Sequence, residues 1–259
     1  MTSISENLKE GLKYPLIEKN KFMVVYVLNI LIFALIIFSN FKLIDNFTKL
    51  PKDAFTVNSL FSSVSPEVII GFVVVLIISI FLKGYAYKVL ESGINHSKDL
   101  PDFNVNLFVP GIKLFVVEFI YAFIPAVVLN LGMANSIWLF IFGIIFLIIF
   151  SLFAIVGEAH MIGTGSFKAA FAFGKIVKLI RSIGILNYIG ALIFYEFAFI
   201  IISISLSIIL FALILLLGGL GVLAIAIVGV IILSLLYSYI FLSKFYLYGT
   251  IYDLMNESK

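Results

Sequence analysis

The sequence contains no cysteine and little charge. The absence of cysteine among its 259 residues excludes disulfides, thiolate nucleophiles, haem attachment through cysteine and thiolate metal sites. Charged residues make up only 12% of the chain and hydrophobic residues 63%, whereas a soluble domain is about a quarter charged and about half apolar. This apolar excess is too large for one globular core, so we expect lipid to surround most of the chain.

Groups for catalysis and for metal binding are equally scarce. There are two histidines: His96 falls in a polar loop, and His160 stands two residues from Glu158, which puts the pair on different faces of a helix. The patterns HExxH, HxxE and GxSxG and phosphate-binding loops are missing. We therefore expect no enzyme activity, no metal and no cofactor. The net charge of +3 does not indicate a nucleic-acid partner, because basic residues commonly flank membrane spans.

Six apolar segments are long enough to cross a hydrocarbon core of roughly 30 Å as helices. They predict an all-α, polytopic membrane bundle over residues 22–248, with an amphipathic segment over residues 1–21 before it and a tail over residues 249–259 behind it. The glycine-rich break at residues 217–221 predicts a tight hairpin between the last two spans. The predicted spans are Phe22–Phe38, Val68–Leu82, Leu114–Leu131, Ile137–Val156, Leu186–Leu217 and Leu220–Leu242.

Basic residues concentrate on one side of these spans. All but three of the 17 lysines and arginines fall in the N-terminal segment, in the connections after the second and fourth spans, or after the sixth span. The other three, Lys42, Lys49 and Lys52, stand in the first connection. Because cytoplasmic connections carry the excess of lysine and arginine, we expect a cell-membrane protein with both termini in the cytoplasm.

The connection after the fourth span has a two-sided pattern over Gly165–Gly184. Its cations fall on one helical face, and Ala169, Phe173, Ile176, Ile180 and Ile183 fall on the opposite one. This predicts an amphipathic helix at the cytoplasmic interface that contacts anionic lipid headgroups or other anions. The alternative, compatible with it, is a plain connector that follows the usual bias of basic residues. The cations are Lys168, Lys175, Lys178 and Arg181.

Glu118 and Glu196 lie inside apolar segments, each surrounded by phenylalanine and tyrosine. An ionised carboxylate in hydrocarbon costs several kcal/mol. Since no lysine or arginine lies deep in a predicted span, we expect no ion pair to neutralise them, which leaves protonation, hydrogen bonds or a polar cavity. One interpretation is a proton-linked or cation-binding site between the third and fifth spans. The other is a neutral glutamate bonded to a neighbouring helix or reaching the interface.

Two further features concern the ends of the spans. Glu158 follows the fourth span, and we expect it to reach the lipid headgroups. The tails KGYAYKVLESG, after the second span, and FYLYGTIYDLMNES, after the sixth, are distantly alike. Together with the similar surroundings of Glu118 and Glu196, they suggest an internal duplication of helix pairs.

A series of short motifs runs through the connections and span ends. The motifs are Gly84-Tyr85, Leu100–Phe103 (LPDF), Gly111, Pro125, Gly165-Ser166-Phe167 and Ala169-Ala170-Phe171. In their order and spacing they resemble the archaeal multi-pass membrane family called domain of unknown function 4013, over roughly Tyr14 to Tyr248. The chain departs from the family at residues 104–106, where an acidic or tryptophan-containing stretch is usual. The resemblance implies a polytopic membrane protein and supplies no catalytic residue.

Two classes of function follow from these features. The first is a transporter-like or lipid-handling protein, with Glu118 and Glu196 as its polar centre and the cations of Gly165–Gly184 attracting anionic headgroups or solutes. The second is a non-catalytic scaffold that organises lipids or partner proteins, in which the glutamates serve helix packing alone. In both, the expected partners are membrane lipids, with anionic headgroups on the cytoplasmic side, and a second copy of the chain or another membrane protein.

Overall fold

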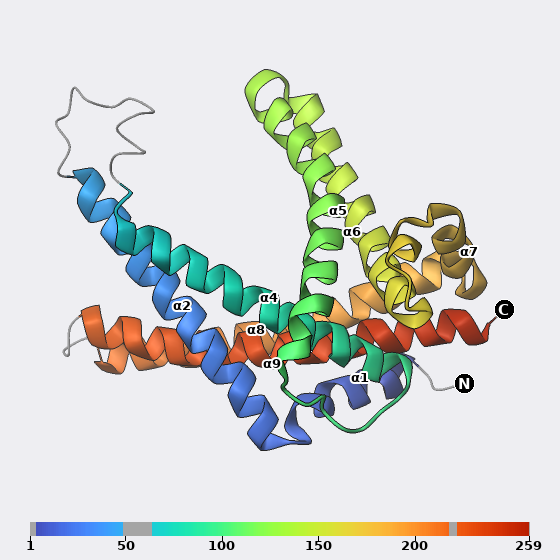
Figure 1. The fold of residues 1–259 in the computed structure, drawn as a ribbon, viewed down its shortest axis with the longest axis horizontal. Coiled ribbons are helices and arrows are strands. Elements are labelled where there is room, and N and C mark those ends of the chain that lie inside the picture. Colours follow the sequence, from blue (N-terminus) through green and yellow to red (C-terminus); the bar gives the residue numbers. More distant parts are fainter. Residues whose placement is uncertain (1–3, 49–63, 218–221, 259) are drawn as a thin grey trace.

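The computed structural model describes residues 4–48, 64–217 and 222–258, which are almost entirely helical and contain no strand (Figure 1). Six of the helices are long and apolar enough to cross a membrane, which confirms the predicted all-α, six-span bundle. The chain is therefore a multi-pass membrane protein. The long helices are α2 (Lys19–Thr48), α4 (Pro66–Ile94), α5 (Phe108–Asn135), α6 (Ile137–Thr164), α8 (Ile185–Leu217) and α9 (Val222–Glu257).

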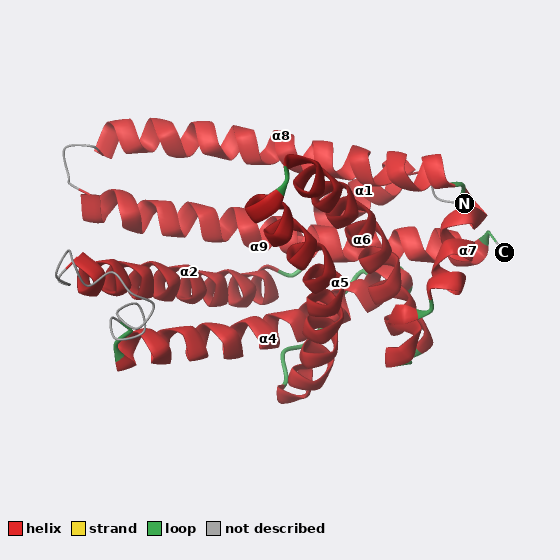
Figure 2. Ribbon diagram, turned by 90° about the horizontal axis from the view of Figure 1, so that it is seen from above, coloured by secondary structure: helices red, strands yellow, loops and turns green. Residues whose placement is uncertain are grey.

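The long helices form three hairpins, α2–α4, α5–α6 and α8–α9, which meet at one end and diverge toward the other (Figures 1 and 2). We call the shared end, where both chain termini lie, the base, and the opposite ends the tips. The α5–α6 hairpin projects steeply away from the other two (Figure 1). The short elements α1 (Ile4–Lys13), η1 (Tyr14–Leu16), η3 (Val105–Leu107), η4 (Phe167–Phe171) and α7 (Phe173–Ile183) lie at the base.

The prediction of one continuous helix over Gly165–Gly184 is wrong, because the segment is divided into η4 and α7. Gly165 adopts a left-handed conformation with a φ of 68° and ends α6, and Ala172 separates η4 from α7. Within α7, Ile176 and Ile180 are buried while the cations are exposed. Phe173, which was expected on the same apolar face, is 48% exposed, and the amphipathic helix at the interface remains a prediction.

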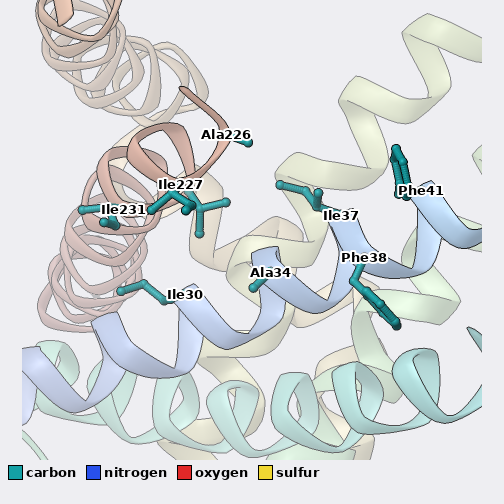
Figure 3. A pocket seen from close by; sticks show the side chains of 9 residues that line it. Ile30, Ala34, Ile37, Phe38, Phe41, Ala226, Ile227 and Ile231 are labelled. Atoms are coloured by element: carbon teal, nitrogen blue, oxygen red, sulfur yellow. The ribbon is translucent and has the colours of Figure 1, made fainter. Parts of the chain in front are cut away.

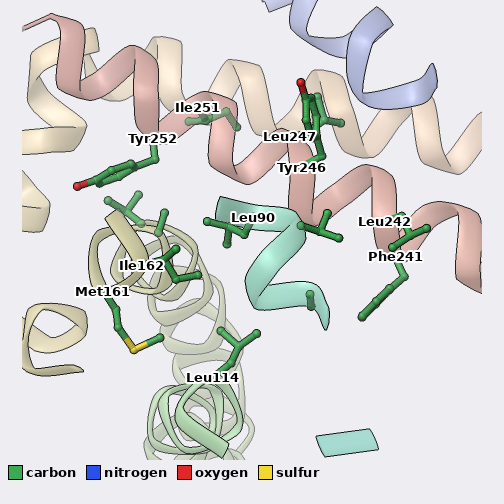
Figure 4. Packing of buried hydrophobic residues seen from close by; sticks show 14 of the residues in the cluster. Leu90, Leu114, Met161, Ile162, Phe241, Leu242, Tyr246, Leu247, Ile251 and Tyr252 are labelled. Carbon is green, nitrogen blue, oxygen red and sulfur yellow. The ribbon is translucent and has the colours of Figure 1, made fainter. Parts of the chain in front are cut away.

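The buried core lies at the base. Its side chains come from the last turns of α4, α6 and α9 and the first turns of α5 and α8, as Figure 4 shows for Leu90, Leu114, Met161 and Leu247. Two glycines, Gly93 and Gly249, bring α4 and α9 into backbone contact, since a Cβ on either would overlap the other helix. Toward the tips, by contrast, most large apolar side chains are exposed, as lipid-facing positions require.

The family motifs Gly84-Tyr85, LPDF and Gly111 come together where α4 crosses α5. Gly84 faces the backbone of η3 at Leu107, and Gly111 faces the backbone of α4, so closely that neither leaves room for a Cβ. Phe103 of the LPDF motif stacks face to face on Tyr85, with ring centroids 4.2 Å apart. Lys21 also contacts the LPDF motif, with Nζ 2.6 Å from the carbonyl oxygen of Leu100. These contacts fix α4 against α5 and so position Lys83, which directly precedes Gly84.

Candidate functional site

Glu118 forms an ion pair with Lys83, with 2.5 Å between the carboxylate oxygen and Nζ. The expectation that no cation could neutralise it is wrong. Lys83 follows directly after a predicted span, but α4 continues as a helix to Ile94, so Lys83 stands eleven residues before its end. The crossing of α4 and α5 then brings it to Glu118, and both side chains are less than one-third exposed.

Glu196 forms an equivalent ion pair with Lys244, with 2.6 Å between oxygen and Nζ. Here too the expected absence of an ion pair is wrong, because α9 continues well past its apolar segment and carries Lys244 within the helix. The Tyr248 hydroxyl lies beside the same carboxylate. In both pairs the lysine belongs to a helix that runs from tip to base and the glutamate to one that runs from base to tip. This parallel agrees with an internal duplication, which remains a prediction.

Glu118 and Glu196 are not brought together. Each belongs to a separate helix pair, α4–α5 for Glu118 and α8–α9 for Glu196, and no contact between the two is found among the described residues. Because each carboxylate has a lysine of its own, neither requires a shared polar cavity for its neutralisation.

Glu158 is the acidic residue whose position the sequence mispredicted. It was expected to reach the headgroups, but α6 remains helical to Thr164 and turns Glu158 into the base, where the residue is only 6% exposed. Its carboxylate interacts electrostatically with Glu118 and with Lys83. Three helices of two hairpins, α4, α5 and α6, therefore contribute to a group of two carboxylates and one lysine.

The two histidines take structural positions. The Nδ1 atom of His160 lies 2.9 Å from the Tyr252 hydroxyl and links α6 to α9. The Nε2 atom of His96 lies 3.1 Å from the Asp253 carboxylate and ties the end of α4 to α9. Within the described part of the chain, no three His, Cys, Asp or Glu side chains gather in a way that could hold a metal ion.

The cations of η4 and α7 are all exposed at the base, and we call them the basic row: Lys168, Lys175, Lys178 and Arg181. They stand on an outer surface of the base, away from the buried Glu158. The structure thus separates a basic surface from a buried acidic group.

An apolar groove lies between α2 and α9, on the side of the tips (Figure 3). It has a volume of about 870 Å³ and nine apolar lining residues, among them Ala34, Phe38 and Ile227. The sequence did not predict it, because it arises where two helices from opposite ends of the chain diverge. The only local signal is the small size of Ala34 and Ala226, which leaves room between larger side chains.

The end of the groove nearest the base is closed by polar contacts between the same two helices. The Asn29 amide donates to the Ser238 hydroxyl at 2.9 Å, and both residues are fully buried. The Tyr26 hydroxyl also donates to the carbonyl oxygen of Ile231 at 3.3 Å. We call these contacts the α2–α9 clamp.

Comparison with known proteins gives one match. Residues 67–211 match the model of a family described as "protein of unknown function (DUF4013)". No curated protein and no solved structure matches the chain. The matched range contains Lys83, Glu118, Glu158 and Glu196, whereas the groove residues of α2 and α9 lie outside it.

Proposed function

Given that this chain belongs to the DUF4013 family, we propose that it is a lipid-handling membrane protein that holds the hydrocarbon chain of a bilayer lipid between α2 and α9. The groove carries this proposal: it is lined by apolar side chains alone, closed toward the base by the α2–α9 clamp and open at the side. Its volume falls within the range of about 300–1,000 Å³ typical of ligand pockets.

The occupant is a lipid because the groove lies within membrane-spanning segments. A lipid hydrocarbon chain that moves from the bilayer into the groove gains no hydrophobic free energy, since both surroundings are apolar. Preference for the groove therefore comes from van der Waals packing against its walls. We therefore expect the groove to select lipids by the length and shape of their hydrocarbon chains.

The positive charge of the basic row adds a second lipid contact to the proposal. We propose that the basic row contacts anionic lipid headgroups, and that the base faces the cytoplasm, where anionic lipids and basic protein segments meet. The groove lies on the side of the tips and would serve lipids of the opposite leaflet. The proposal assigns the chain no catalysis, no cofactor and no nucleic-acid partner.

A non-catalytic scaffold that organises lipids or partner proteins, including a second copy of this chain, is the second candidate function. The ion pairs Lys83–Glu118 and Glu196–Lys244 favour it, because they neutralise both glutamates within helix contacts. For the same reason, transport of a solute through a site shared by Glu118 and Glu196 is not part of the proposal.

The substitution Ala34→Phe tests the lipid-handling proposal by filling the groove, and Ala122→Phe is the matched control on an exposed face of α5. Purified protein is reconstituted with phosphatidylglycerol that carries a photoreactive group on its acyl chain, and crosslinked peptides are identified by mass spectrometry. Overpacking costs about 1–3 kcal/mol, so we expect crosslinking to residues 30–41 to fall about tenfold in Ala34→Phe and to stay unchanged in Ala122→Phe. Even labelling of all six spanning helices, insensitive to Ala34→Phe, would show only the lipid that surrounds any membrane protein and would refute the proposal.

A further inference from the structure

The charges buried at the base do not balance. Lys83 stands near two carboxylates, Glu118 and Glu158, and forms an ion pair with Glu118 alone. The second ion pair, between Glu196 and Lys244, is balanced by itself. Glu158 is 6% exposed, and no hydrogen bond or ion pair joins it to any residue that the structure describes. One negative charge is therefore left over if every carboxylate is ionised.

The hydroxyl groups around Glu158 do not neutralise this charge. Tyr121 of α5, Tyr188 of α8 and Tyr248 of α9 are close enough to interact with it electrostatically. The Tyr121 hydroxyl, however, donates to the carbonyl oxygen of Ala170 at 2.7 Å.

The other donors near Glu158 are engaged in the same way. The Tyr188 hydroxyl donates to the carbonyl oxygen of Leu152 at 2.6 Å, and Tyr248 lies beside Glu196. His160, the other titratable group near Glu158 on α6, bonds to Tyr252. An ionised carboxylate without a donor or a counter-ion of its own costs several kcal/mol in an apolar interior.

Two small ligands could remove this cost: a metal cation or a proton. A metal cation needs several oxygen ligands in its coordination shell. Around Glu158 the hydroxyls are engaged elsewhere, and no acidic or histidine cluster able to hold a metal occurs in the part of the chain that the structure describes. A proton needs no ligand beyond the carboxylate itself, so the geometry favours the proton.

We propose that Glu158 is a proton-binding site of this protein and that its proton sets how Lys83 is shared at the base. With the proton bound, Glu158 is neutral and Lys83 pairs with Glu118, which ties α4 to α5. When the proton leaves, the Glu158 carboxylate competes with Glu118 for Lys83, which draws α4 toward α6. Proton binding is thereby coupled to the packing of the hairpins α2–α4 and α5–α6. This inference does not depend on the lipid groove, which lies on the side of the tips.

Infrared spectroscopy of the full chain in liposomes tests the proposal, because a protonated carboxyl group has a C=O stretching band that is separate from the bands of carboxylates. At neutral pH we expect one such band. It should disappear in Glu158→Gln and persist in Glu91→Gln, a matched loss of a partly exposed acidic residue that pairs with Lys88. Circular dichroism establishes that both variants are folded.

A second variant keeps the test decisive if Glu158→Gln does not fold. Glu158→Asp retains a titratable carboxyl group in a slightly different position, so the frequency of the band should shift. Absence of the band from the unmodified protein would overturn the proposal, and so would a band unchanged in Glu158→Gln or in Glu158→Asp. Loss of the lipid crosslink to the groove would leave the infrared result unaffected, so the two proposals fail separately.

Discussion

Removing Lys83 should destabilise the protein more than removing Glu118, although the two residues are the two ends of one ion pair. Lys83→Met leaves the Glu118 carboxylate without a cation. Glu118→Gln leaves a lysine that still interacts electrostatically with Glu158. A purely pairwise ion pair would give equal losses, so the difference between the two substitutions measures the influence of Glu158.

The expected magnitudes follow from the burial of the pair. Removing one partner of a fully buried ion pair costs about 3–5 kcal/mol. The side chains of Lys83 and Glu118 are 27% and 29% exposed, so solvent weakens the effect. We expect a loss of about 2–3 kcal/mol in the free energy of unfolding for Lys83→Met. For Glu118→Gln we expect about 1 kcal/mol or less, because the amide keeps its hydrogen-bonding capacity.

The assay is reversible unfolding in mixed micelles with increasing denaturing detergent, followed by the circular dichroism of the helices. Lys88→Met is the matched control, since it removes a lysine of the same helix that is more exposed than Lys83 and whose pair with Glu91 contributes little. Adding Glu118→Gln to Lys83→Met should recover part of the lost stability, because it removes the carboxylate that has lost its cation. Equal losses for Lys83→Met and Glu118→Gln, or no recovery in the double variant, would refute the electrostatic reasoning.

Two further predictions concern the packing of the base and its outer surface. Gly84→Ala should lower the free energy of unfolding by about 1–3 kcal/mol, because a Cβ there overlaps the backbone at Leu107. The control Gly190→Ala places its Cβ in open space and should stabilise α8 by about 0.5–1 kcal/mol. The same micelle assay checks both, and equal effects would contradict the proposed close approach of α4 and η3. Replacing the four cations of the basic row by glutamine should reduce the phosphatidylglycerol that co-purifies with the protein, since each cation near an anionic surface contributes about 1 kcal/mol. Native mass spectrometry at rising salt measures this, and lipid retention that is independent of both the cations and the salt would argue against headgroup binding.

The number and type of the spanning helices could be predicted from the sequence because lipid imposes a local rule. Each apolar segment has to form its own backbone hydrogen bonds, so about 20 consecutive apolar residues specify a helix without reference to the rest of the chain. What the rule does not set is where a helix ends once it leaves the hydrocarbon. The continuation of α4 through Lys83 and of α9 through Lys244 depends on packing at the base.

The candidate sites, too, could be predicted from the sequence only in part. Glu118 and Glu196 could be singled out because a carboxylate is conspicuous in an apolar segment, but their lysine partners lie 35 and 48 residues away along the chain. Glu158 was assigned to the headgroup region because it stands at the end of an apolar segment, where a polar residue is ordinary. Its burial results from the meeting of hairpins that no local pattern encodes.

Composition and hydrophobic runs thus determined by themselves that this chain is a six-helix membrane protein. The reason is that unpaired backbone groups and charges are unfavourable in lipid, so each segment must satisfy its own backbone groups. The tertiary structure alone decided which charges meet. It brought Lys83 to Glu118 and Lys244 to Glu196, buried Glu158 without a partner among the described residues, and opened the groove between α2 and α9. The physical reason is that ion pairs and grooves depend on the crossing of helices distant in the chain, and close contacts such as that between Gly84 and the backbone at Leu107 set those crossings.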